Sequence, residues 1–307
     1  MLLGIGDDAA AWQPSRSHRS IVTTDALVDG VHFSSAQTGA RAIGHRAMAS
    51  NLSDVAAMGA RPVLAVVALG VPQGVDPEWI LEAYRGLDAL ARKHGARVVG
   101  GDIVRAPALT FAVTVIGEVS PTRLRTRSGG RAGDVLALTG PLGASRAGLE
   151  LLRRDVPVTA GAREAALRAH ETPTPRIAEG RWLAASANVR AMMDCSDGLS
   201  TDVGRLAEAS RLAAVIDDVP VDPVAVAVAG ACGVNPLAYA LDGGEDFELL
   251  VAIAPRAFGH LSRAFARRFG RALLRIGTLR EGAGVTLRGA DGERELHAGG
   301  WDNLASR

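Results

Sequence analysis

The feature that most constrains this chain of 307 residues is a set of acidic loops that recur along its length. The first is Gly4-Ile5-Gly6-Asp7-Asp8, in which two adjacent carboxylates lie in a glycine turn. Two carboxylates about 5 Å apart repel by roughly 3 kcal/mol at an effective dielectric constant of about 20. If the loops converge in one cleft, hard cations with oxygen ligands must neutralise them. In each later loop a carboxylate stands beside glycine or a hydroxyl group: Thr23-Thr24-Asp25, Asn51-Leu52-Ser53-Asp54, Gly100-Gly101-Asp102, Asp194-Cys195-Ser196-Asp197-Gly198 and Asp242-Gly243-Gly244-Glu245-Asp246.

Two common phosphate-binding motifs are not supported. Gly4, Gly6 and Ala9 fit the dinucleotide pattern G-x-G-x-x-A, but that motif needs a preceding strand and a helix start that is open to the pyrophosphate. In this sequence only three residues precede Gly4, and two aspartates occupy the turn. A phosphate loop needs a lysine after its glycine, whereas the only lysine, Lys93, falls on a helical stretch. The remaining alternative for the first turn is an Asp-rich surface turn without a ligand, and the downstream repeats make that alternative less favoured.

Composition limits the class of protein. With 48% hydrophobic and 22% charged residues, the chain is globular and long enough for two domains. A net charge of +1 argues against a nucleic-acid or acidic-membrane partner. Cys195 and Cys232 lack metal-site spacing, and no apolar run reaches a membrane span of roughly 20 residues. We therefore expect a cytoplasmic protein with neither a zinc site nor a disulfide framework.

The first part of the chain predicts mixed β and α elements. Residues 21–24 form a β-branched run that places Asp25 at a strand end, and residues 96–99 place Asp102 at another. Apolar spacing predicts a helix over 41–59, a second helix over 76–94 with Asp76 as its N-cap, and strands over 62–71 and 108–119. The strand over 62–71 is apolar enough to be central.

A polar turn over 126–134 separates this part from the next, so we expect domains at 1–120 and 121–307. The second domain is predicted to contain strands over 135–138, 189–193 and 247–253 and helices over 143–152, 163–187, 201–209 and 255–269, the second interrupted at 172–175. The densest acidic loop, 194–202, precedes one of these helices. An N-cap role for Ser200 or Asp197 explains one of its polar residues but not all of them.

Taken together, seven motifs resemble the thiamine-monophosphate kinase family over nearly the whole chain. They occur in order and with matching separations: Gly4-Ile5-Gly6-Asp7-Asp8, Thr23-Thr24-Asp25, Asn51-Leu52-Ser53-Asp54-Val55-Ala56-Ala57-Met58-Gly59-Ala60, Gly100-Gly101-Asp102, Arg127-Ser128-Gly129, Asp194-Cys195-Ser196-Asp197-Gly198-Leu199 and Gly243-Gly244-Glu245-Asp246. Members usually carry a helical segment before the first motif, whereas this chain begins almost on it. The resemblance therefore supports the residues implied for the chemistry more strongly than it supports a lid over the substrate or nucleotide.

The resemblance implies an α/β fold of the aminoimidazole ribonucleotide synthetase type. In that fold an N-terminal mixed sheet dimerises and a C-terminal α/β domain closes the cleft. The reaction it implies is ATP-dependent phosphorylation of thiamine monophosphate to thiamine diphosphate, with several Mg²⁺ ions and a homodimeric enzyme.

Specific residues follow from the same resemblance, position by position. The implied metal ligands are Asp8, Thr23, Thr24, Asp25, Asp54, Asp102, Asp194 and Asp197. The implied nucleotide contacts are Tyr84, Gly101, Asp102, Arg127 and Ser196. The implied substrate contacts are His32, Glu245 and Trp301, and the implied catalytic set is Asp25, Asp54, Asp102, Asp194 and Arg127.

The residues also support phosphoryl transfer without the resemblance. In the absence of a phosphate-loop lysine, Mg²⁺ held by carboxylate loops must neutralise the transferring group, and Arg127 could assist. The acceptor needs no general base, because a phosphomonoester with a second pKa near 6 is already mostly dianionic at neutral pH.

Structural alternatives remain for single residues. Alone, His32 more often serves as a polar loop residue, Tyr84 and Trp301 as core residues, and Arg127 as a solvated charge. Asn51 and Asp54 could form a solvated helix flank. Alternatives for the whole chain are a selenophosphate synthetase or aminoimidazole ribonucleotide synthetase, and a non-catalytic cation- or nucleotide-binding protein. The reactive cysteine expected of a selenophosphate synthetase has no counterpart at the N-terminus of this sequence.

Overall fold

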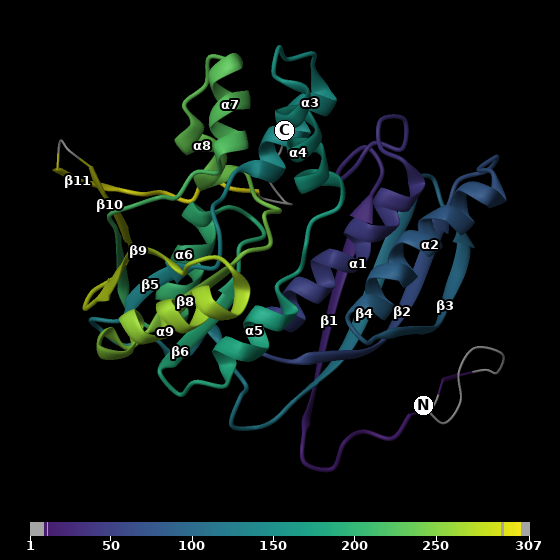
Figure 1. Ribbon diagram of the computed structural model, residues 1–307. Coiled ribbons are helices and arrows are strands. Elements are labelled where there is room, and N and C mark those ends of the chain that lie inside the picture. The colour runs from purple at the N-terminus through teal and green to yellow at the C-terminus, as the bar shows by residue number, and fades with distance from the viewer. Residues whose placement is uncertain (1–8, 11, 290–291, 302–307) are drawn as a thin grey trace.

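A computed structural model describes residues 9–10, 12–289 and 292–301. The chain forms two sheets, one of four strands and one of seven. Figure 1 shows helices α1 and α2 across one face of the smaller sheet, with the larger sheet and its helices on the other side of the molecule. The turn at Gly4–Asp8, including the predicted ligand Asp8, lies outside the described residues.

The four-stranded sheet has the order β1-β4-β2-β3, so the apolar strand β2 lies inside it, as its composition predicts. The predicted helices over 41–59 and 76–94 and the strands over 62–71 and 108–119 are confirmed. The side chain of Asp76 caps α2 by accepting a hydrogen bond from the Glu78 amide. The elements of this half are β1 (Arg19–Val28), α1 (Ala40–Ala57), β2 (Arg61–Val71), α2 (Pro77–Lys93), β3 (Arg97–Arg105) and β4 (Thr110–Val119).

Two expected strand ends were wrong. β1 continues past Asp25 because it pairs with β4 as far as Val28, and β3 continues past Asp102 because it pairs with β2 as far as Arg105. Polar residues interrupt the apolar pattern from which the strand ends were predicted. They are tolerated in the continuing strands because they lie on an exposed face or at a sheet edge.

The seven-stranded sheet has the order β11-β10-β7-β9-β5-β8-β6. The predicted strands over 135–138, 189–193 and 247–253 and the helix over 255–269 are confirmed, and the helical region over 163–187 is divided into two helices. The elements are η1 (Arg127–Gly129), β5 (Val135–Leu138), α3 (Ala144–Arg153), α4 (Ala160–Glu171), α5 (Ile177–Ala184), β6 (Val189–Asp194), α6 (Leu199–Ala209), β7 (Ala213–Ile216), α7 (Pro223–Ala231), α8 (Pro236–Asp242), β8 (Leu249–Ile253), α9 (Pro255–Phe269), β9 (Leu274–Arg280), β10 (Val285–Gly289) and β11 (Gly292–Glu295).

One hydrophobic core runs through both halves. Buried side chains of α1, β2 and β4 join those of β8 and α9 in a single cluster. Close helix contacts support the junction: a Cβ atom at Gly180 of α5 would lie 2.2 Å from the Ala56 carbonyl oxygen of α1. The chain passes to the second sheet between β4 and β5, and the domain limit at residue 120 stays a prediction.

Candidate active site

The site begins on the face of β1 that is turned toward α1. Because side chains alternate along a strand, Thr23 and Asp25 project from the same face. The Thr23 hydroxyl donates a hydrogen bond to the carboxylate of Asp54 on α1. The pKa of Asp25 is raised to about 6, chiefly by burial and also by the charges of Asp54 and Asp197, against a lowering hydrogen bond from Ser50.

A third carboxylate reaches the same place from the second sheet. Asp194 is the last residue of β6 and is 2% exposed. It accepts a hydrogen bond from the Ser53 hydroxyl of α1, with an Oγ to Oδ2 distance of 2.7 Å. Burial raises the pKa of Asp194 to about 8, and the charge of Asp54 adds to the rise. Burial also raises the pKa of Asp54.

The loop after β6 is held by a buried carboxylate. Asp202, which is fully buried, accepts hydrogen bonds from the amides of Ser196 (3.0 Å) and Asp197 (3.1 Å). Asp197 forms an ion pair with Arg205. The N-cap of α6 is Gly198, where the loop turns with φ 111°, so the alternative of an N-cap role for Asp197 or Ser200 does not hold. Asp202 binds the preceding amides from within the helix. We call Asp25, Asp54, Asp194 and Asp197 the acidic cluster.

A second arginine, besides Arg205, acts on the acidic cluster. Arg127 lies in the short helix η1, and its charge lowers the pKa of both Asp54 and Asp194. Its own backbone is anchored, since its carbonyl oxygen accepts a hydrogen bond from the Ser210 hydroxyl at 2.8 Å. The structure therefore places the one predicted cationic residue where it can act on an anion bound at the cluster.

The acidic cluster suits Mg²⁺ by its donor chemistry. Burial and the charges of neighbouring carboxylates raise the pKa values of Asp25, Asp54 and Asp194, and a bound cation would relieve both effects. Among the described residues no three His, Cys, Asp or Glu side chains form a ready-made metal cage. That arrangement still fits Mg²⁺, which is usually held by one or two carboxylates together with water and substrate phosphate.

The predicted substrate residues gather next to this cluster. The rings of His32 and Trp301 lie with centroids 5.8 Å apart. The Trp301 amide donates a hydrogen bond to the Asp197 carbonyl oxygen at 2.9 Å, and a Cβ atom at Gly300 would lie 2.0 Å from that oxygen. Only a residue without a side chain fits this close approach at Gly300. Arg46 donates to both Glu245 carboxylate oxygens at 2.7 Å and to the His32 carbonyl oxygen at 3.1 Å. We call His32, Arg46, Glu245 and Trp301 the Glu245 site.

Comparison with known proteins identifies the family of the chain. Family models match both halves of the chain: the N-terminal domain of AIR synthase related proteins at residues 6–119 and the C-terminal domain at 131–289. A thiamine-monophosphate kinase of Synechococcus elongatus is 37% identical over 291 residues, covering 93% of this chain and 86% of the relative. The chain belongs to the thiamine-monophosphate kinase family.

Solved structures of the family have the same fold. The thiamine-monophosphate kinase of Stenotrophomonas maltophilia matches with a TM-score of 0.85 at 35% identity, covering 94% of this chain and 91% of that one. The AaThiL protein in complex with AMPPCP and TMP matches with a TM-score of 0.83 at 31% identity, covering 95% and 89%. The expected fold is thus confirmed, and membership of the family makes the chain an enzyme of the kinase class.

Four residues implied by the kinase family lie apart from the acidic cluster. Thr24 projects from the opposite face of β1, where its hydroxyl bonds to the Val113 carbonyl oxygen and to Thr114. Gly101 and Asp102 lie in the exposed part of the edge strand β3. Tyr84 is half-buried on α2 and packs against the shared core.

Three residues that hold the kinase site together were missed by sequence reasoning: Arg46, Ser53 and Asp202. Ser53 and Asp202 lay inside motifs that the sequence had singled out, but each binds a partner rather than facing the cleft. Arg46 had a usable signal, because a charged residue within the otherwise apolar stripe of a helix needs a buried partner.

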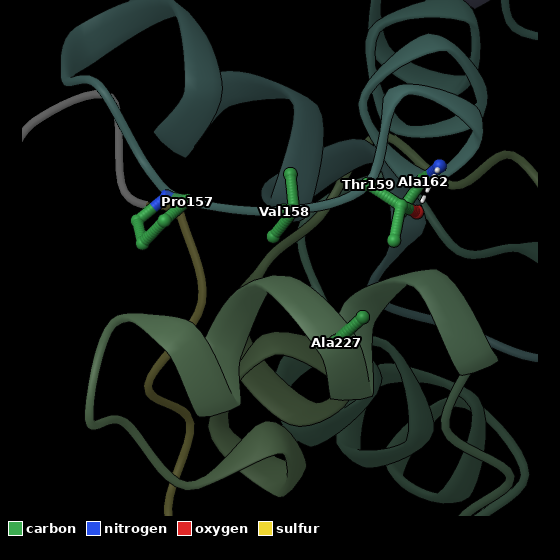
Figure 2. A pocket seen from close by; sticks show the side chains of 5 residues that line it. All are labelled: Pro157, Val158, Thr159, Ala162 and Ala227. Carbon is green, nitrogen blue, oxygen red and sulfur yellow. Dashed lines mark hydrogen bonds between the residues drawn. The ribbon is translucent and has the colours of Figure 1, made fainter.

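A separate hollow lies away from these residues, between the segment before α4 and helix α7 (Figure 2). Its lining is mostly apolar: Pro157, Val158, Thr159, Ala162 and Ala227. The Thr159 hydroxyl already caps α4 by accepting a hydrogen bond from the Ala162 amide at 3.3 Å. The hollow has no carboxylate in its lining and is not the candidate active site.

Proposed function

We propose that the protein transfers the γ-phosphoryl group of ATP to thiamine monophosphate, releasing ADP and thiamine diphosphate. The observation that carries the proposal is the meeting of Asp25, Asp54 and Asp194 from three different elements, with Arg127 facing them. Such a site can receive two phosphate anions only together with cations. The AaThiL relative bound to AMPPCP and TMP supports the same pair of substrates.

Mg²⁺ is the proposed cofactor. It would be held by members of the acidic cluster and Thr23, and it would supply charge neutralisation of the phosphates. Asp8, Thr24 and Asp102 stay further proposed ligands, but Thr24 and Asp102 lie apart from the acidic cluster and would have to hold a separate cation. The residues of the chain orient the reactants: Arg127 faces the transferring group, while Tyr84, Gly101, Asp102 and Ser196 are proposed to contact the nucleotide.

Transfer is proposed to be direct and in line. The acceptor phosphate is its own nucleophile, because it is mostly dianionic at neutral pH. The enzyme then contributes positioning and electrostatic stabilisation rather than a general base. Chiral γ-phosphate should therefore emerge with inverted configuration, whereas retention or a trapped phosphoenzyme would contradict direct transfer.

A homodimer is proposed through the outer face of the four-stranded sheet. Val22 on that face is 70% exposed, and the register β1-β4-β2-β3 places Thr24, Ala26, Ala68 and Asp102 on the same side. An exposed sheet face with apolar side chains favours a symmetric partner. Light scattering at micromolar concentration should give twice the chain mass, and a monomer would contradict the proposal.

The substrate is tested by product identity. Purified protein with ATP and Mg²⁺ should release ADP only when thiamine monophosphate is added, and thiamine diphosphate should appear in equal amount. ADP release without thiamine diphosphate would contradict the proposed function and favour another ATP-using member of the superfamily. No helix among the described residues is long and apolar enough to cross a membrane, and the cytoplasmic location stays a prediction.

A further inference from the structure

Helix α1 carries a buried charge. Arg46 is 2% exposed and lies among the apolar residues that attach α1 to both halves of the core. Burying a guanidinium group is costly unless a counter-charge and hydrogen-bond acceptors accompany it. Its position therefore calls for a partner of opposite charge.

That partner comes from the other half of the chain. Nη2 of Arg46 donates to both carboxylate oxygens of Glu245, each at 2.7 Å, and to the His32 carbonyl oxygen at 3.1 Å. Its Nε and Nη1 groups are buried without a hydrogen-bond partner among the described residues. One nitrogen atom thus connects two residues assigned to the substrate, and the rest of the guanidinium group depends on Glu245 for compensation.

Glu245 is presented by a constrained loop. Its backbone lies in the left-handed region at φ 56°, which is uncommon for a residue with a side chain. The conformation is fixed by a hydrogen bond from its amide to the Ser196 carbonyl oxygen at 2.8 Å. His170 of α4 approaches its carboxylate to 3.8 Å, and burial lowers the pKa of His170 to about 4, so this imidazole is neutral near pH 7.

The Glu245 carboxylate still reaches solvent. Its side chain is 34% exposed while Arg46 behind it is buried. Burial would raise the pKa of Glu245, but the Arg46 guanidinium outweighs that effect and holds the pKa below its usual range. An ionised carboxylate therefore stands near His32, whose ring lies 5.8 Å from that of Trp301.

We propose that Arg46 is a positioning residue for the thiamine end of the substrate. It orients the Glu245 carboxylate and fixes the His32 loop. The carboxylate and the rings of His32 and Trp301 can then contact one heterocycle that is cationic and carries an amino group. This inference rests on the proposed function. The chemistry is complementary, because an ionised carboxylate accepts hydrogen bonds from an amino group and an aromatic face attracts a cation. Arg46 touches no substrate itself and acts through its two partners.

The proposal separates recognition of the acceptor from recognition of the nucleotide. In steady-state assays with both substrates varied, R46M should raise KM for thiamine monophosphate by about 10- to 100-fold, the range expected for losing hydrogen bonds to a charged group. KM for ATP should change less than about twofold, because the acidic cluster and Arg127 are untouched. R46K keeps the charge and should recover part of the loss.

A control is the partly buried pair of Arg176 with Glu248, which joins the start of α5 to the residue before β8, also includes Arg271 and contains no residue assigned to substrate. R176M should lower the melting temperature while the ratio of the two KM values stays at the wild-type level. A merely structural Arg46 would behave in the same way. Equal KM ratios for R46M and R176M would overturn the proposal.

A second variant keeps the test independent of how well R46M folds. E245Q changes only the partly exposed end of the pair and should raise KM for thiamine monophosphate to a similar degree. R46M combined with E245Q should cost less than the two single effects added together, because both act through one contact. Full additivity would overturn the proposal. Failure of the wild-type protein to phosphorylate thiamine monophosphate would instead overturn the proposed function.

Discussion

The acidic cluster and the Glu245 site lie side by side and use the same side-chain chemistry in opposite ways. In the acidic cluster, burial and mutual repulsion raise the pKa values of Asp25 and Asp194. In the Glu245 site, Arg46 lies 2.7 Å from the carboxylate and holds the pKa of Glu245 down. Asp25, Asp54 and Asp194 have no ion-pair partner among the described residues, whereas Glu245 has one in Arg46.

This difference indicates what each site can bind. Carboxylates that the protein does not neutralise are stabilised by cations from solution, and such cations can bring phosphate oxygens with them. A carboxylate that is already paired has no need of a metal ion and can accept hydrogen bonds from an organic ligand. The loop over 195–197 joins the two sites, because Ser196 bonds to Glu245 and Asp197 bonds to Trp301.

The largest effect should come from removing a charge in the acidic cluster. We expect D54N, and likewise D25N, to lose at least about a hundredfold in kcat, since each 1.4 kcal/mol of lost transition-state stabilisation is tenfold in rate. The melting temperature should not fall, because both carboxylates are destabilised by burial. D88N is the control, as Asp88 pairs with Arg92 on the surface of α2. Near-wild-type turnover of folded D54N would contradict a catalytic role for the cluster.

A smaller effect should follow from changing the Glu245 site. We expect W301A to raise KM for thiamine monophosphate by roughly 3- to 30-fold, the range of one cation–π contact, with KM for ATP nearly unchanged. W79A is the matched control, because Trp79 packs on the core near Phe111 and should affect melting instead. If W301A leaves KM for thiamine monophosphate unchanged and lowers the melting temperature strongly, Trp301 has a structural role and does not bind substrate.

The smallest effect should be a pH dependence of stability. Without metal, the pKa values of Asp194 (about 8), Asp202 (about 7) and Asp246 (about 7) are raised above those of the unfolded chain. The native state therefore binds more protons, and stability must fall as pH rises from 6.5 to 8. We expect the melting temperature to drop by about 2–5 °C over this window, and Mg²⁺ at pH 8 to recover part of the drop.

E245Q sharpens that comparison. The pKa of Glu245 is lowered, so this carboxylate is ionised in both the folded and the unfolded chain between pH 6.5 and 8. E245Q should leave the slope of melting temperature against pH unchanged, whereas D194N should flatten it. A slope that responds equally to both variants would contradict the division between the two sites.

The helices, the strands and the type of chemistry could be predicted from the sequence more accurately than the contacts between residues. Apolar periodicity located α1, α2 and β2 because their burial leaves a regular pattern. It misplaced Asp25 and Asp102 at strand ends, since backbone pairing, which no side chain reveals, carries β1 and β3 onward. The segment over 210–241 received no assignment, although it contains β7, α7 and α8.

Only some residues of the candidate site could be predicted from the sequence. Motifs named Asp54 and Asp194, but the bond from Ser53 to Asp194 spans 141 positions and the bond from Arg46 to Glu245 spans 199. Such pairings arise from the shared core, which brings α1 against the second sheet. Local patterns could not supply them, and Asp202 was hidden for the same reason, because its role is to hold two backbone amides.

The central claim is that the acidic cluster works only when cations from solution complete its charge. The most direct measurement is the rate of thiamine diphosphate formation by the wild-type protein at saturating ATP and thiamine monophosphate, with Mg²⁺ varied from chelated to millimolar. We predict no turnover in the presence of chelator and a saturable rise with Mg²⁺, displaced to higher Mg²⁺ in D25N. Turnover that persists when divalent cations are chelated would contradict the account.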